Sequence, residues 1–279
     1  MALLLTDPPE AAERLRRWLA DFQRVMVLTG AGCSTASGIP DYRDAAGQWK
    51  RPPPVTYQAF TEDPAVNARY WARSMVGWPR VATAVPNRAH QALAGWQASG
   101  MLSRLLTQNV DGLHQRAGSK EVIDLHGRID EVRCLDCQLL FPRALIQQSL
   151  RQQNPGWADI AAATAPDGDA DLEAMDFGGF RVPDCGACGG RLKPDVVFFG
   201  ENVPRARYET SRLALQDSDA LLVVGSSLMV YSGFRFARIA HETGKPIALL
   251  NLGKTRADDI ASLKLDADCA AVLSSALDA

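Results

Sequence analysis

The stretch that decides the fold is Val25–Arg43, which reads VMVLTGAGCSTASGIPDYR. Its apolar start, Val25–Leu28, leads into Gly30-Ala31-Gly32, as a buried parallel strand does when it ends in a turn that approaches phosphate. A dehydrogenase fingerprint would place a third glycine where Thr35 stands. It would also place an acidic residue about 20 residues further on, where the chain reads Gln48-Trp49-Lys50-Arg51. The loop therefore predicts a dinucleotide site that differs from that of a dehydrogenase.

Length and composition indicate an ordinary globular protein. The 279 residues suffice for one large domain with a small inserted module. The net charge of −2 gives no sign of a general affinity for nucleic acid or for an acidic membrane surface. No apolar run reaches the ~18 residues of a membrane span, and no basic segment with a cleavage signal marks a secretory leader. We therefore expect a cytoplasmic protein that binds neither nucleic acid nor membranes.

Strand-like apolar runs alternate with helical segments along the chain. After Val25–Leu28 the expected strands are Leu102–Thr107, Val122–Leu125, Val196–Phe199, Leu221–Val224 and Ile247–Asn251. The expected helices are Pro8–Phe22, Arg88–Ser99, Ala206–Gln216 and Gly233–Thr243. This alternation is typical of an α/β fold, a parallel Rossmann-like sheet with helices on both faces.

Two segments interrupt this alternation. Residues 44–87 are rich in Trp, Tyr and Pro and predict an inserted helical lid or a segment that faces the substrate. Residues 128–192 hold four paired cysteines around an acidic, Gly-rich middle, which can fill little core without a metal. We therefore expect a Rossmann-like domain formed by residues 1–127 and 193–279, with a zinc-binding module at 128–192.

The paired cysteines predict a structural metal site. They form two Cys-x-x-Cys pairs, Cys134 with Cys137 and Cys185 with Cys188. Four thiolates at this spacing are typical of tetrahedral zinc, and such a closed shell leaves no place for a catalytic water. A redox dithiol, an iron–sulfur site and a nucleic-acid-binding ribbon are the alternatives, and the acidic loop argues against the last.

Polar residues follow two of the expected strands, where open α/β sheets bind ligands. Asn109 and Asp111 come after Leu102–Thr107 and could hold an amide, although a capped helix start would use the same residues. His126 follows Val122–Leu125 and is either a general base near neutral pH or a structural histidine.

Two further strand ends carry candidate binding residues. Val196–Phe199 is either an ordinary core strand or a segment that an extended peptide joins by strand addition. Gly225-Ser226-Ser227 ends another apolar run in a small-residue turn that could approach phosphate or ribose.

Six motifs in a fixed order make the chain resemble a sirtuin. They are GAGCSTASGIPDYR from Gly30, TQNVD from Thr107, LHG from Leu125, the two Cys pairs, VFFGE from Val197 and GSS from Gly225. The resemblance covers the chain from about residue 20 to the end. It implies a large Rossmann domain, a small zinc module, and NAD in the cleft between them. It also implies NAD-dependent removal of an acyl group from lysine, with transfer to ADP-ribose and release of nicotinamide.

The resemblance also implies a role for each matching residue. His126 would be the catalytic base, assisted by Asn109. The NAD contacts would be Gly30, Ala31, Gly32, Ser34, Ile39, Tyr42, Arg43, Gln108, Asn109, Asp111, Gly225, Ser226, Ser227, Asn251 and Cys269. Val197 and Phe198 would hold the acyl-lysine of a protein substrate. Cys33 departs from the family, which usually has an aliphatic residue at that position.

Two features of the sequence bear on which acyl group would be removed from lysine. The sequence resembles the class II branch of the sirtuins. Tyr70 and Arg73, however, reproduce a Tyr-x-x-Arg spacing that another sirtuin class uses to bind succinyl or malonyl carboxylates. A deacetylase, a desuccinylase or demalonylase, a lipoamidase and a mono-ADP-ribosyltransferase would all use this site. The rivals outside this chemistry are a dehydrogenase and a non-catalytic NAD-sensing or zinc-ribbon module.

Overall fold

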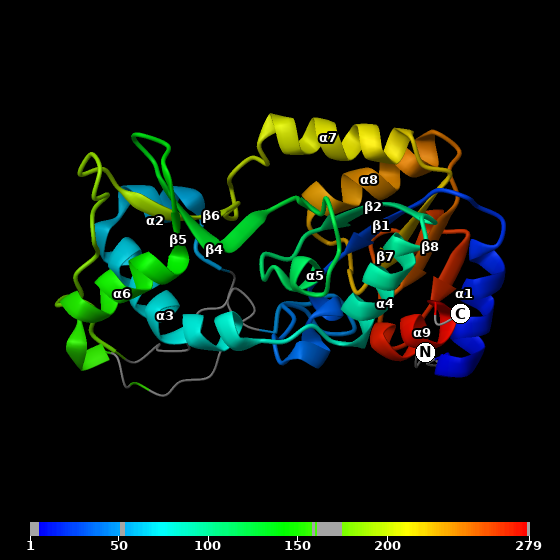
Figure 1. The fold of residues 1–279 in the computed structure, drawn as a ribbon, viewed down its shortest axis with the longest axis horizontal. Helices are drawn as coiled ribbons and strands as arrows, with labels where there is room; N and C mark the ends of the chain where they lie inside the picture. Colours follow the sequence, from blue (N-terminus) through cyan, green and yellow to red (C-terminus); the bar gives the residue numbers. More distant parts are fainter. Residues whose placement is uncertain (1–5, 51–53, 158–159, 161–174, 278–279) are drawn as a thin grey trace.

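The computed structural model describes residues 6–50, 54–157, 160 and 175–277. Its larger lobe contains a six-stranded parallel sheet with the order β3-β2-β1-β7-β8-β9 (Figure 1). These strands are β1 Val25–Thr29, β2 Leu102–Thr107, β3 Ile123–Asp124, β7 Ala220–Val224, β8 Ile247–Leu250 and β9 Leu263–Leu265. The predicted Rossmann-like sheet is confirmed, and its strand order reverses between β1 and β7.

Helices cover both faces of this sheet. One face carries α1 Pro8–Leu19, α4 Arg88–Ala98 and α9 Cys269–Leu277, and the other carries α7 Arg205–Gln216 and α8 Tyr231–Glu242. Successive residues of β1 serve the two sides alternately, because side chains alternate along a strand. Val27 packs with the α1, α4 and α9 side, whereas Leu28 packs with the α7 and α8 side. None of the helices that the structure describes has the length and apolarity needed to cross a bilayer.

The smaller lobe joins segments from three parts of the chain (Figure 1). Its antiparallel sheet has the order β5-β4-β6, with β4 Gly127–Cys134, β5 Leu140–Pro142 and β6 Leu192–Val196. Its helices are α2 Tyr57–Glu62, α3 Pro64–Thr83 and α6 Arg143–Gln153. Trp71 of α3, Val132 of β4 and Leu150 of α6 share one apolar cluster. The helices within 44–87 thus complete the core of the lobe that carries the paired cysteines.

The remaining elements are short turns. They are α5 Leu113–Arg116 and the 3-10 turns η1 Ala31–Cys33, η2 Thr35–Ser37, η3 Pro155–Trp157 and η4 Asp258–Ile260.

The expected strand Val196–Phe199 is wrong. The strand is β6, it ends at Val196, and it pairs antiparallel with β4 instead of joining the parallel sheet. Beyond it Val197 donates to the His126 carbonyl at 2.7 Å, and Phe199 makes an isolated bridge to Thr56. These apolar residues line a cleft, so their hydrophobicity does not mark a sheet core. The middle of the acidic, Gly-rich segment, residues 161–174, lies outside the described residues.

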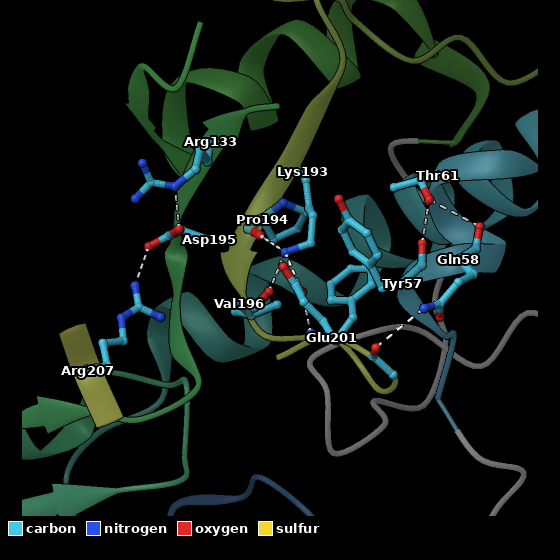
Figure 2. A network of polar contacts seen from close by, with 12 residues as sticks. Tyr57, Gln58, Thr61, Arg133, Lys193, Pro194, Asp195, Val196, Glu201 and Arg207 are labelled. Carbon is cyan, nitrogen blue, oxygen red and sulfur yellow. Dashed lines mark hydrogen bonds and ion pairs between the residues drawn. The ribbon is translucent and has the colours of Figure 1, made fainter. Parts of the chain in front are cut away.

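Asp195 ties the small sheet to the large lobe. Its carboxylate accepts from Arg133 of β4 at 2.8 Å and from Arg207 of α7 at 2.9 Å (Figure 2). Burial would raise the pKa of Asp195, but the hydrogen bonds and charges of the two guanidinium groups outweigh it and lower the pKa. This carboxylate therefore stays ionised and fixes β6 between the lobes.

Candidate active site

A cleft of about 420 Å³ is lined by residues of both lobes. It lies at the carboxyl ends of β1, β2 and β7, where the strand order reverses, which is where open α/β sheets bind their ligands. Residues of the small lobe, including Tyr70 and Phe198, line it from the other side. A cleft of this size suits a small organic ligand.

Glycines let the turns after β1 and β7 touch at the floor of the cleft. Gly30 donates to the Val224 carbonyl at 3.0 Å, and Gly32 donates to the Gly225 carbonyl at 2.9 Å. A Cβ on Gly30 would lie 2.7 Å from that of Ser226, and a Cβ on Gly225 would lie 2.4 Å from the Cys33 nitrogen. Only glycine allows this approach, and Gly225 also has a φ of 59°, in the left-handed region. The loop thereby exposes backbone to the cleft.

Asn109, Asp111 and Ser34 form one wall of the cleft. Asn109 Nδ2 donates to Ser34 Oγ and to the Gly30 carbonyl, each at 3.0 Å. Ser34 Oγ in turn donates to Asp111 Oδ2 at 2.7 Å. The other oxygen, Asp111 Oδ1, accepts from the Leu113 backbone at 2.8 Å, where α5 begins. One oxygen of Asp111 thus binds the backbone at the start of the helix, while the other supports the cleft wall.

His126 is held in a defined tautomer. Its Nδ1 lies 2.9 Å from the Gln108 carbonyl, which can only accept, so Nδ1 carries the proton. Nε2 then accepts from the Ser232 hydroxyl at 2.8 Å. Burial lowers the pKa of His126 to about 4, although the bond to Gln108 opposes this effect. The imidazole is therefore neutral near pH 7, with the lone pair of Nε2 directed to the cleft residue Ser232.

Sequence reasoning missed the role of Ser232. It stands in Tyr231-Ser232-Gly233 at the start of α8, and nothing in that stretch indicates that its hydroxyl meets a histidine 106 positions away. Gln108, which holds the other side of the imidazole, also donates from Nε2 to Ser226 Oγ at 2.7 Å. Residues from the end of β2 and the start of α8 thus contact the imidazole, and the Gln108 side chain links this contact to the turn after β7.

A cation–π pair stands at the edge of the cleft. The guanidinium carbon of Arg43 lies 3.9 Å from the ring centroid of Trp49, and Arg43 also donates to the Gly47 carbonyl at 2.8 Å. The Tyr42 ring meets Trp49 edge-on at 6.2 Å. Trp49 is a second residue that sequence reasoning missed, because its place after the glycine turn indicates only that the ribose-binding acid of a dehydrogenase is absent.

The segment after β6 forms an apolar wall. The Phe198 ring packs 5.0 Å from Phe60 and 5.1 Å from Tyr70, measured between centroids. Val197 also lines the cleft, beside the peptide group that is bonded to the His126 carbonyl. This wall therefore lies next to the imidazole.

An ion pair between a buried lysine and a partly buried glutamate shapes that segment (Figure 2). Lys193, only 5% exposed, donates from Nζ to the Val196 carbonyl at 2.5 Å and pairs with Glu201 Oε2 at 3.0 Å. The same Glu201 oxygen accepts from the Phe198 backbone at 2.8 Å. Burial lowers the pKa of Lys193, and the negative charge of Glu201 opposes this. The pair closes the loop from Val196 to Glu201 around one ammonium group.

Most of the predicted site residues line this one cleft. They are Gly30, Ala31, Gly32, Ser34, Ile39, Tyr42, Arg43, Tyr70, Gln108, Asn109, Asp111, His126, Val197, Phe198, Gly225, Ser226, Ser227 and Asn251. Within the described part of the chain, Arg73 and Cys269 are not among the lining residues. The thiol of Cys269 lies 3.6 Å from the Gly32 carbonyl, so it supports the glycine loop from behind.

The four paired cysteines converge on one point in the small lobe. Cys134 Sγ lies 3.5 Å from Cys188 Sγ, and Cys137 Sγ lies 3.8 Å from Cys185 Sγ. All four sulfurs lie within 4.8 Å of one another. A Zn–S bond of about 2.3 Å requires tetrahedral S···S edges of roughly 3.8 Å. The cluster therefore has the donors and the dimensions of a zinc site.

Comparison with known proteins extends the likeness over nearly the whole chain. Residues 30–232 match the model of the Sir2 family. An NAD-dependent protein deacetylase of Xanthomonas campestris pv. campestris strain 8004 is 61% identical over 93% of this chain and 88% of its own length. An enzyme of the same name from Bordetella bronchiseptica is 58% identical over 94% of this chain and 95% of its own.

Solved structures agree with this comparison. A Sir2 protein in complex with a p53 peptide and NAD+ is 31% identical, with a TM-score of 0.73 over 94% of this chain and 95% of that one. A Sir2 protein bound to a propionylated peptide is 30% identical, with a TM-score of 0.71 over 94% of both chains. The chain therefore belongs to the Sir2 family, the sirtuins.

Proposed function

We propose that this protein is an NAD-dependent protein lysine deacetylase, which transfers the acyl group to ADP-ribose and releases nicotinamide. One observation carries the proposal: a single cleft holds the glycine loop, the Asn109–Asp111 wall, the His126 imidazole and the apolar wall at Phe198. Relatives about 60% identical over most of their length have the name NAD-dependent protein deacetylase.

The cleft suits NAD. The backbone cradle at Gly30–Gly32 would receive the diphosphate, since a Cβ there would clash with the neighbouring turn. Ser226 and Asn251, both nearly buried, would bind the adenosine end. Ile39, Asn109 and Asp111 would line the nicotinamide pocket. When bound, NAD supplies the ribose carbon to which the acyl oxygen bonds as nicotinamide leaves.

His126 would act as the base for a ribose hydroxyl. Because Nδ1 is bound to the Gln108 carbonyl, Nε2 is the atom that takes the proton. The Ser232 hydroxyl occupies that lone pair in this structure and must turn away to admit the ribose. Asn109 would orient the nicotinamide end through the amide that now reaches Ser34.

The apolar wall would receive the acyl-lysine side chain. Val197 and Phe198 offer backbone and apolar surface beside His126, and Tyr70 lies against Phe198. Arg73 is not among the described residues that line this cleft, which supports a preference for acyl groups without a carboxylate. We therefore favour removal of acetyl or other uncharged acyl groups.

Zinc would be structural in this protein. Cys134, Cys137, Cys185 and Cys188 would hold one ion per chain, and four thiolates leave no position for substrate or water.

We also propose a boundary between the Rossmann-like domain and the zinc module near residues 127 and 192. A cytoplasmic location is part of the proposal, because paired thiols of this kind suit a reducing compartment. The net charge of −2 supports the absence of nucleic-acid binding.

The proposal is tested with an acetyl-lysine peptide and NAD, by measuring nicotinamide release and the masses of both products. We expect a free-lysine peptide and an O-acetyl-ADP-ribose of matching amount. His126→Ala should lower turnover roughly 10²–10⁴-fold, while His241→Ala, at an exposed position of α8, should not. ADP-ribose attached to protein without loss of acetyl groups would instead show a mono-ADP-ribosyltransferase.

A further inference from the structure

A second group of metal-ligating side chains lies behind the glycine loop. Cys33 belongs to η1, His90 to α4 and His114 to α5. One ligand atom from each lies within 4.8 Å of the others, and none of the three residues is more than 1% exposed. None of them lines the cleft, and the proposed reaction uses none of them.

The existing hydrogen bonds leave one nitrogen of each ring without a partner. His90 Nδ1 accepts from the Asn87 backbone at 3.3 Å, and His114 Nε2 lies 2.9 Å from Thr29 Oγ1. His90 Nε2 and His114 Nδ1 are buried and form no hydrogen bond, and the ring centroids lie 4.7 Å apart. A buried polar atom without a partner costs roughly 1–3 kcal/mol. Two such atoms beside a buried thiol point to a ligand.

The chemistry of the donors selects a thiophilic cation. A thiolate and two imidazoles are ligands that zinc prefers, and three protein ligands leave one of its four positions open. The negative charge of Asp111 acts on both Cys33 and His90. The Cys33 thiolate would offset one charge of Zn²⁺, and the nearby Asp111 carboxylate would offset part of the other, which limits the desolvation penalty.

We propose that Cys33, His90 and His114 form a buried zinc site, separate from the four-cysteine cluster. Binding transfers the Cys33 thiol proton to solvent and moves the His90 ring proton from Nε2 to Nδ1. The long contact between His90 and the Asn87 backbone is given up in exchange. The Asn87 side chain keeps α4 capped, because its Oδ1 accepts from Ala89 at 2.9 Å. The ion would join η1, α4 and α5 directly beneath the glycine loop.

The test measures metal content and does not depend on catalysis. The full-length protein is expressed in medium supplemented with zinc, so that the ion is present while the chain folds, and zinc per chain is determined by mass spectrometry. We expect the wild type to hold one zinc ion more than Cys33→Ser or His90→Gln. His241→Gln is the matched control, because it removes an exposed histidine outside the cluster and should keep the full zinc content.

Anomalous scattering at the zinc edge from crystals of the wild-type protein provides a readout that no variant's folding can disturb. A peak among Cys33, His90 and His114, besides the one at the four cysteines, would support the site. A wild-type protein with zinc at the four cysteines alone would overturn the proposal, as would equal zinc content in the wild type and in a folded Cys33→Ser variant.

Discussion

At the residue scale, the protonation of His126 determines how the protein should respond to pH. Burial lowers the pKa of His126 to about 4, below its usual value near 6.5. A base must be neutral to accept a proton, so the active form persists down to pH values near 4. We therefore expect kcat/KM to show no loss centred near pH 6.5 as the pH is lowered from about 8 to 5.5.

The measurement is the pH dependence of kcat/KM for an acetylated peptide, together with an NMR titration of the His126 ring in the ligand-free protein. His126→Asn identifies the histidine signal. A His126 pKa near 6.5 in the free protein, with a matching fall in kcat/KM, would contradict the expectation.

Arg73 supplies a second prediction at this scale. Because its position is not part of the described cleft lining, Arg73→Met should change desuccinylation and deacetylation by similar factors. The measurement is kcat/KM for two peptides that differ only in the acyl group. A loss of desuccinylation far greater than that of deacetylation would show that Arg73 binds an acidic acyl group after all.

At the element scale, the loop after β6 depends on one ion pair. Lys193→Met would leave Glu201 without its ammonium partner and would remove the donor to the Val196 carbonyl. The Lys193 side chain is 6% exposed but that of Glu201 is 26% exposed, so the cost of about 3–5 kcal/mol for breaking a fully buried pair falls here to roughly 2–3 kcal/mol. We expect a loss of this order in the free energy of unfolding, and a higher KM for the peptide because the loop carries Val197 and Phe198.

Urea unfolding measures the first effect and peptide kinetics the second. Arg238→Ala is the control, because it breaks the ion pair between Arg238 and Glu242, whose side chains are 49% and 60% exposed, respectively. Such exposed pairs contribute about 1 kcal/mol or less. The same small loss in both variants would mean that the Lys193–Glu201 pair does not hold the loop.

The elements also show what sequence reasoning could reach. The parallel strand Leu102–Thr107 has the bounds that the sequence predicts, because Gly100 precedes its leucines and the polar residues Gln108 and Asn109 follow them. The prediction of a core strand at Val196–Phe199 failed, because the apolar residues of a cleft wall and those of a sheet core have the same composition. Ser232 could not be found, since a hydroxyl that meets His126 only through folding leaves no spacing or motif in the sequence.

At the scale of the whole molecule, the cleft depends on the small lobe as much as on the sheet. Cys134 and Cys185 belong to the same apolar cluster as Tyr70 and Phe198, so the metal site and the acyl wall share one core. The strands β1 and β7, whose ends would bind NAD, pack in two different clusters, against helices of the large lobe. The two halves of the site should therefore respond differently to loss of metal.

Removing zinc should loosen the small lobe and abolish turnover while the parallel sheet stays folded. The four sulfurs lie within 4.8 Å of one another, and a bound ion would hold β4 and β6 together where the strands approach the cysteines. Without the metal, this link between the two strands is lost. Hydrogen exchange should accelerate in β4, β5 and β6 and remain slow in β1, β7 and β8, because the latter strands are fully buried between helices.

Cys188→Ser provides this loss without a chelator and leaves Cys33, His90 and His114 untouched. Cys188 is exposed, so the substitution itself removes little packing, and any loosening must come from the lost thiolate. We expect the variant to lose peptide turnover and the exchange protection of β4 and β6, whereas β1 and β7 keep theirs. Full turnover in a verified zinc-free protein would show that the apolar cluster around Trp71 and Val132 is stable alone, and that the metal is not needed to hold the acyl wall against the sheet.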